Sequence, residues 1–176
     1  LALIPKALAK ERVEIALGLA RASEITGDRE RQESALKQAL AGAERNSVQL
    51  LRSLLNAGRF ATITGQSADA KSKLEEALTL AKSLKDHSRE IEAILALAQL
   101  SREQSHWSAS KEYYDQALIL SRRISNSLYE SSALKGIGYI FSEQGLPNES
   151  ISSLEKAIAV YRKIGNNWQM VLTQLG

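Results

Sequence analysis

The stretch LKGIGYIFSEQGLPNESISSLEKA at residues 134–157 decides the fold. Its apolar residues recur at steps of three and four positions in two segments, which is the spacing of amphipathic helices. A polar break, QGLPN at residues 144–148, separates the segments; within it Gly145 can end the first helix and Asn148 can cap the second. We therefore expect a helix, a short turn and a second helix over this stretch.

The same pattern recurs along the chain at a spacing of about 40 residues. Residues 54–77 and 94–117 repeat it, and residues 16–39 carry an earlier and less regular copy. At the start of the last copy, Ser127 followed by Glu130 predicts a capping box. We predict one repeat domain over residues 1–176, made of four repeats and the first helix of a fifth, at 8–46, 47–86, 87–126, 127–166 and 167–176.

Two rows of small residues accompany the repeat. They are Gly58, Ala98 and Gly138 in the first helices and Ala77, Ala117 and Ala157 in the second helices. Large side chains in these rows would push the paired helices apart. Close packing of the two helices of each pair is therefore predicted along both rows.

The unit resembles the tetratricopeptide repeat, although its period is longer than the usual period of about 34 residues. In the most regular copy the resemblance is carried by Leu134, Ile137, Gly138, Phe141, Ser150, Leu154 and Ala157. It implies an all-α fold, a right-handed α-solenoid of antiparallel helix-turn-helix pairs whose first helices line the concave side. The chain begins with Leu1 and not with methionine, so we expect it to be a piece of a longer protein.

The composition argues against several kinds of chemistry. The 176 residues include no cysteine and two histidines. A chain without cysteine has no disulfide, no thiol nucleophile and no cysteine zinc site. His87 and His106 stand in separate turns, and neither has a second ligand at the spacing that a metal site needs. We therefore expect a protein that is not an enzyme and that uses neither a metal nor a cofactor.

The charge pattern bears on the partner. The net charge is +3, but acidic and basic residues are interspersed along the chain. Nucleic-acid binders usually concentrate Lys and Arg in a patch or stripe, so a nucleic-acid partner is not expected. No apolar run approaches the ~20 residues that span a bilayer, so a membrane partner is not expected either. These features favour a cytoplasmic protein whose partner is a protein or a peptide.

The candidate binding site is the face of each first helix that points away from the packing residues. The candidate partner-binding residues are Arg21, Arg52, Asn56, Arg59, Gln99, Arg102, Lys135 and Tyr139. Arginine pairs bidentately with carboxylates, so this row could hold an extended acidic peptide. The alternative is a solvated face whose basic charges are balanced by Glu14, Glu24, Glu92 and Glu103.

We therefore expect a non-catalytic interaction module that binds a peptide or a partner subunit on the concave face. An alternative from another class is the sensor or scaffold segment of a larger signalling protein, such as a transcription regulator or a protease-like effector. Long-period tetratricopeptide arrays occur in proteins of that kind. An RNA-binding solenoid is a third, disfavoured alternative. An uncapped last helix could also pair with that of a second copy to form a homodimer.

Overall fold

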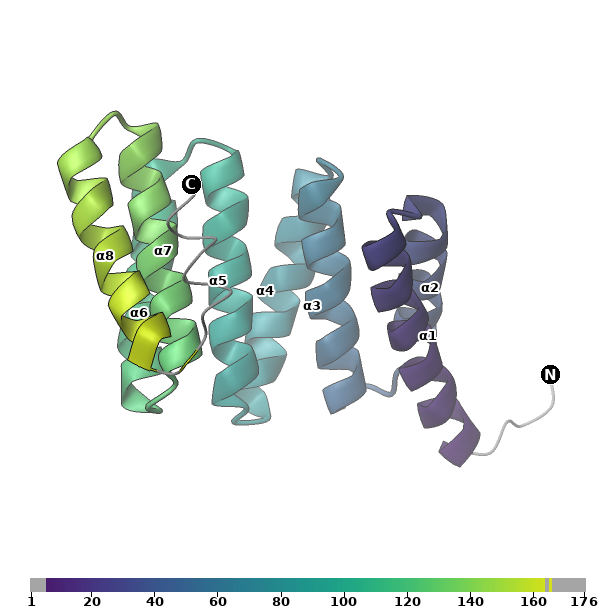
Figure 1. Ribbon diagram of the computed structural model, residues 1–176. Coiled ribbons are helices and arrows are strands. Elements are labelled where there is room, and N and C mark those ends of the chain that lie inside the picture. The colour runs from purple at the N-terminus through teal and green to yellow at the C-terminus, as the bar shows by residue number, and fades with distance from the viewer. Residues whose placement is uncertain (1–5, 164, 166–176) are drawn as a thin grey trace. The chain divides into compact units, whose positions relative to one another are not determined.

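The structure is a computed structural model that describes residues 6–163 and 165. Within this range every regular element is an α-helix, and consecutive helices are joined by short turns (Figure 1). The helices are α1 (Lys6–Thr26), α2 (Arg29–Gly42), α3 (Val48–Ile63), α4 (Ser67–Ser83), α5 (His87–Glu103), α6 (Trp107–Arg123), α7 (Ser127–Glu143) and α8 (Pro147–Lys163). The predicted all-α repeat fold is confirmed. The predicted fifth-unit helix at 167–176, and with it the predicted homodimer contact, lie outside the described residues.

The chain divides into two compact units, Leu1–Arg89 and Glu90–Gly176. In the first unit α1 packs against α2 and α3 packs against α4, while α3 also contacts the preceding pair. In the second unit α7 packs against both α6 and α8. α2, α4 and α8 therefore pack on their own first helices, and α2 and α6 also contact the first helix of the next pair in the same unit. A buried hydrogen bond from the Ser110 hydroxyl to the Ala98 carbonyl links α6 to α5. How the helical pairs group into domains stays a prediction.

The small residues of the first helices allow the close crossing that the sequence predicts. A methyl group added at Gly58 would lie 2.6 Å from Cδ2 of Leu74, and one added at Gly138 would lie 2.7 Å from Cδ2 of Leu154. A buried hydrogen bond also links α7 and α8: the Ser150 hydroxyl donates to the Gly138 carbonyl at 2.9 Å. The close packing predicted at Gly58 and Gly138 is thus confirmed.

Polar caps begin several helices. Asp28 accepts a hydrogen bond from the Arg31 amide at 3.0 Å and caps α2. The predicted capping box at Ser127 is wrong, because α7 already includes that residue. Its cap is Asn126, whose side chain accepts from the Tyr129 amide at 3.2 Å. The predicted Asn148 cap is also wrong, because α8 begins one residue earlier, at Pro147.

The turns share one backbone feature, a residue in the left-handed region. In the turns inside the pairs these residues are Gly27, Gly65, Ser105 and Gly145, in the turns between pairs they are Asn46, Lys85 and Ser125, and Gly165 follows α8. This conformation costs an L-residue roughly 1–2 kcal/mol, whereas glycine adopts it readily. Ser105, with φ of 58°, therefore holds a conformation that suits glycine better.

We expect Ser105→Gly to raise the free energy of unfolding by about 0.5 kcal/mol, because relief of the left-handed strain exceeds the added chain entropy of glycine. Urea unfolding followed by circular dichroism measures the change. The matched control is Ser152→Gly, at an exposed position inside α8, which should lower stability by a similar amount through helix propensity. If the free energy of unfolding changed in the same direction in both variants, left-handed strain at Ser105 would be contradicted.

Candidate functional site

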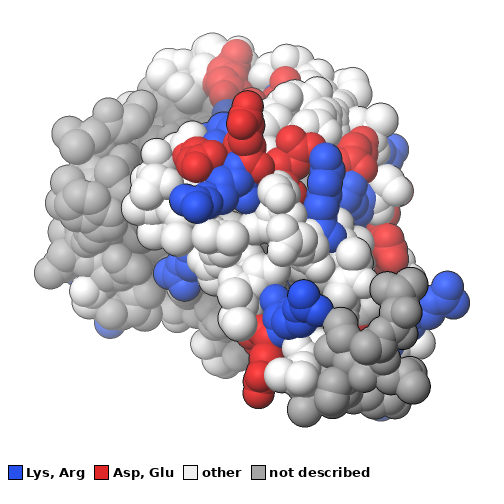
Figure 2. Space-filling view, turned by 90° about the vertical axis from the view of Figure 1, so that its right-hand side faces the viewer, with Lys and Arg blue, Asp and Glu red and all other residues white. Residues whose placement is uncertain are grey.

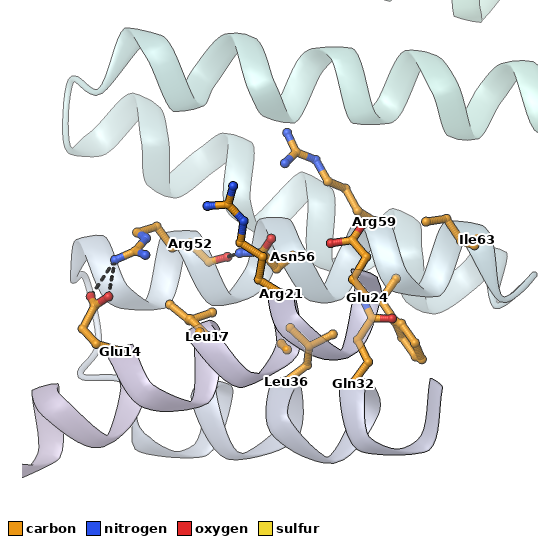
Figure 3. A pocket seen from close by; sticks show the side chains of 13 residues that line it. Glu14, Leu17, Arg21, Glu24, Gln32, Leu36, Arg52, Asn56, Arg59 and Ile63 are labelled. Carbon is orange, nitrogen blue, oxygen red and sulfur yellow. Dashed lines mark hydrogen bonds and ion pairs between the residues drawn. The ribbon is translucent and has the colours of Figure 1, made fainter. Parts of the chain in front are cut away.

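The eight candidate residues line two separate hollows, one in each unit. Arg21, Arg52, Asn56 and Arg59 line a cavity of about 500 Å³ that is bounded by α1, α2 and α3, which we call the first hollow (Figure 3). Gln99, Arg102, Lys135 and Tyr139 line a cavity of about 280 Å³ in the second unit, which we call the second hollow. The helical spacing in the sequence therefore identified residues that share a surface within each unit.

The first hollow has an apolar floor and a charged rim. Leu17, Leu36 and Phe60 line it, and each is at least nine-tenths buried. Ile63 also lines it but is 52% exposed. Because Leu17 comes from α1, Leu36 from α2 and Phe60 from α3, the packing of three helices forms the floor. An apolar side chain could therefore bury its surface there.

In the first hollow, the side chains of Arg52 and Asn56 bind neighbouring groups of the chain, and Arg59 also has an interaction partner. The guanidinium of Arg52 donates to both carboxylate oxygens of Glu14, at 2.6 and 2.7 Å. The side-chain amide of Asn56 donates to the Arg52 carbonyl at 2.8 Å. Both members of the ion pair are partly exposed, so its net contribution to stability is about 1 kcal/mol or less. The charge of Arg52 is nevertheless largely neutralised within the chain.

Arg21 differs from Arg52 in its surroundings. Its side chain is exposed, and it forms no hydrogen bond or ion pair with any residue that the structure describes. Figure 3 shows the guanidinium groups of Arg21 and Arg59 projecting to the same side of the hollow. A carboxylate at this side could therefore pair with Arg21 without displacing a described partner.

The second hollow is already occupied by internal charge pairs. The Arg102 guanidinium donates to Glu143, and it donates to Glu103 at 3.1 Å. It also lies 6.0 Å from the centre of the Tyr139 ring, within the range of a cation–π contact. Glu103 is one of the acidic residues that the alternative interpretation of the row invoked. For Arg102 and Arg52 the balanced-charge interpretation therefore describes the observed contacts.

Tyr114 and Gly136 also line the second hollow. The helical spacing in the sequence did not indicate either residue. A methyl group added at Gly136 would lie 2.2 Å from Cε1 of the Tyr114 ring, so the ring packs directly on the α7 backbone. Burial raises the pKa of the Tyr114 phenol above its ordinary value, and the nearby Arg102 guanidinium partly offsets that rise. A glycine in the middle of an apolar helix was the one available signal of this contact.

The remaining surface features agree with the charge pattern of the sequence. On the face drawn in Figure 2, Lys and Arg lie interspersed with Asp and Glu. Among the described residues, no group of three or more His, Asp or Glu side chains is placed to hold a metal ion. None of the described helices is both long enough and apolar enough to cross a membrane.

The fold and the two hollows define the class of the protein, a helical-repeat protein. A model of the tetratricopeptide repeat family matches residues 90–163. The matched segment is therefore made of tetratricopeptide repeats, and it lies within the second unit. Proteins of this repeat fold are generally non-catalytic interaction modules. A comparison with curated proteins finds no match.

Two solved structures have a similar fold. One is aspartyl phosphate phosphatase F from Bacillus subtilis, with a TM-score of 0.79 and 16% identity over 88% of this chain. The chain covers 41% of the length of that phosphatase. The other is BtubC from P. vanneervenii, with a TM-score of 0.70 and 18% identity over 90% of this chain and 72% of BtubC. At these identities the likeness concerns the fold alone.

Proposed function

We propose that the chain is a non-catalytic protein-interaction module that binds a peptide segment or subunit of a partner protein along its first helices. The observation that carries this proposal is the grouping of the eight candidate residues into two hollows. Each hollow combines apolar side chains with hydrogen-bond donors, which is the composition of ligand-binding sites. Repeat proteins use extended surfaces of this kind for binding.

The proposal needs no catalytic group. Acyl or phosphoryl transfer would require a nucleophile or a positioned water, a base and a stabilising group around one reacting atom. The first hollow offers arginines, two glutamates and amides above an apolar floor. This set favours binding of a charged segment over chemistry on it. The name of one structural neighbour, a phosphatase, carries no catalytic residue over to this chain.

The proposal is tested by selecting a display library of random peptides on the whole chain and measuring binding of the selected pool. We expect the variant with Arg21, Arg59 and Arg102 all replaced by glutamate to lose at least about tenfold in affinity, because these side chains line the hollows. Biolayer interferometry measures the affinity, and circular dichroism checks that each variant is folded.

The matched control also replaces three arginines by glutamate, at Arg12, Arg31 and Arg123. These residues are exposed and line neither hollow. Its affinity for the pool should stay within about twofold of that of the unchanged chain, because screening weakens distant exposed charges. Equal losses in the two triple variants would contradict binding at the hollows. Failure of the library to yield any binding peptide would contradict the module itself.

A further inference from the structure

We infer that the first hollow selects a partner segment in which an acidic side chain lies next to an apolar one. In this inference Arg21 pairs with the carboxylate, and the floor formed by Leu17, Leu36 and Phe60 receives the apolar side chain. The inference rests on the proposed function and names the chemistry that one of its two hollows recognises.

The charges of the first hollow favour an acidic occupant. Three arginines and two glutamates line it, so positive charge is in excess. Glu14 already binds Arg52 through both oxygens. Arg21 is exposed on the same rim and has no described hydrogen-bond or ion-pair partner. A guanidinium presents its donors in a planar fork that matches a carboxylate, which makes Arg21 the group best suited to bind an incoming acidic side chain.

The floor adds a second requirement. Leu17 is 6% exposed, Leu36 3% and Phe60 6%, yet all three line a cavity of about 500 Å³. Ile63 extends this apolar surface toward solvent. A purely acidic segment would leave the floor in contact with water, whereas an apolar neighbour of the acidic residue would cover it. The two features together select a mixed segment over a polyacidic one.

The second hollow provides an internal contrast. Its one arginine, Arg102, already binds Glu143 and Glu103 and stacks near Tyr139. An incoming carboxylate would have to displace these glutamates from the guanidinium. Acidic selectivity should therefore depend on Arg21 and be insensitive to Arg102. This difference separates the inference from the broader proposal that either hollow binds peptides.

The test uses one fluorescein-labelled peptide from the selected pool and a second in which its acidic residue is replaced by the matching amide. Fluorescence anisotropy gives the affinity of both peptides for the unchanged chain, for Arg21→Gln and for Arg102→Gln. We expect Arg21→Gln and the amide peptide each to weaken binding about tenfold, and the combination to weaken it no further. Arg102→Gln should leave the affinity within about twofold of the original value.

The apolar requirement is tested separately with Ile63→Ser. This residue is half exposed, so the exchange leaves the buried floor in place. Binding of the labelled peptide should fall about threefold, and a peptide whose apolar residue is replaced by serine should be insensitive to the same exchange. If Ile63→Ser and the serine substitution in the peptide instead weakened binding additively, the inference that the apolar peptide residue contacts the hollow would be overturned.

Two further outcomes separate the two proposals. Peptides whose binding depends on Arg102 and not on Arg21 would overturn the inference and leave the interaction module standing. Selected peptides that lack acidic residues, with equal affinity for the unchanged chain and for Arg21→Gln, would also overturn it. A library that yields no binding peptide would instead count against the proposed function as a whole.

Discussion

Replacing Gly136 by valine is expected to lower the free energy of unfolding of the second unit by about 3 kcal/mol. The added Cβ would lie 2.2 Å from Cε1 and 2.3 Å from Cζ of the Tyr114 ring. The ring is 7% exposed and stiff, so it cannot fold away as the end of a flexible side chain could. Either α6 and α7 must separate or the ring must leave its place. Urea unfolding followed by circular dichroism measures the loss.

Two companion variants identify the cause of that loss. In the double variant with Gly136→Val and Tyr114→Leu, the smaller side chain should recover more than 1 kcal/mol relative to the sum of the single changes. Gly18→Ala is the control, because a methyl group there meets nothing within 4 Å. Alanine is the better helix former, so stability should rise by up to about 1 kcal/mol. A loss at Gly18 equal to that at Gly136 would refute the steric explanation.

In the first unit the largest effect is expected for Leu74→Ala, at about 3 kcal/mol of lost stability. Leu74 is 0% exposed and its side chain packs over Gly58, where α4 crosses α3. Removing it leaves a cavity between the two helices. Because α3 carries Arg52, Asn56 and Arg59, the variant should also bind the selected peptides more weakly. Denaturant unfolding and peptide anisotropy measure the two effects.

The control for this prediction is Ile15→Ala, also in the first unit, where the side chain is 70% exposed. Its stability should change by less than about 0.5 kcal/mol. The double variant with Leu74→Ala and Gly58→Ala should be more stable than Leu74→Ala alone, because the methyl group added at residue 58 partly fills the cavity. A cost below about 1 kcal/mol for Leu74→Ala alone would contradict tight packing between α3 and α4.

The helical pairs and their close crossings could be predicted because they depend on local periodicity and on side-chain size. Gly58 and Gly138 recur in a row, and the recurrence alone indicates a position where a larger side chain would not fit. The caps were less predictable, since Asn126 and Ser127 are both good capping residues and a shift of one position exchanges their roles. Such a shift lies within the ordinary uncertainty of helix ends.

Whether a candidate arginine is already ion-paired within the chain could not be predicted from its position in the sequence. Arg52 and Glu14 occupy the same row in successive repeats, and only the spacing of α1 and α3 brings their side chains together. Arg102 binds Glu143, which lies in the following repeat, by the same principle. The sequence therefore predicts which residues share a surface, whereas the distances between helices decide which of them are already paired. The contact between Tyr114 and Gly136 depends on such a distance as well.

The ion pair of Arg52 and Glu14 has a mechanical consequence. It joins consecutive first helices, so any stretching of the first unit that moves α1 away from α3 must also separate these two charges. Exposed charges are screened by dissolved ions, and the screening length falls from about 10 Å at 0.1 M salt to about 3 Å at 1 M. The attraction by which this pair holds α1 and α3 together therefore weakens as ionic strength rises.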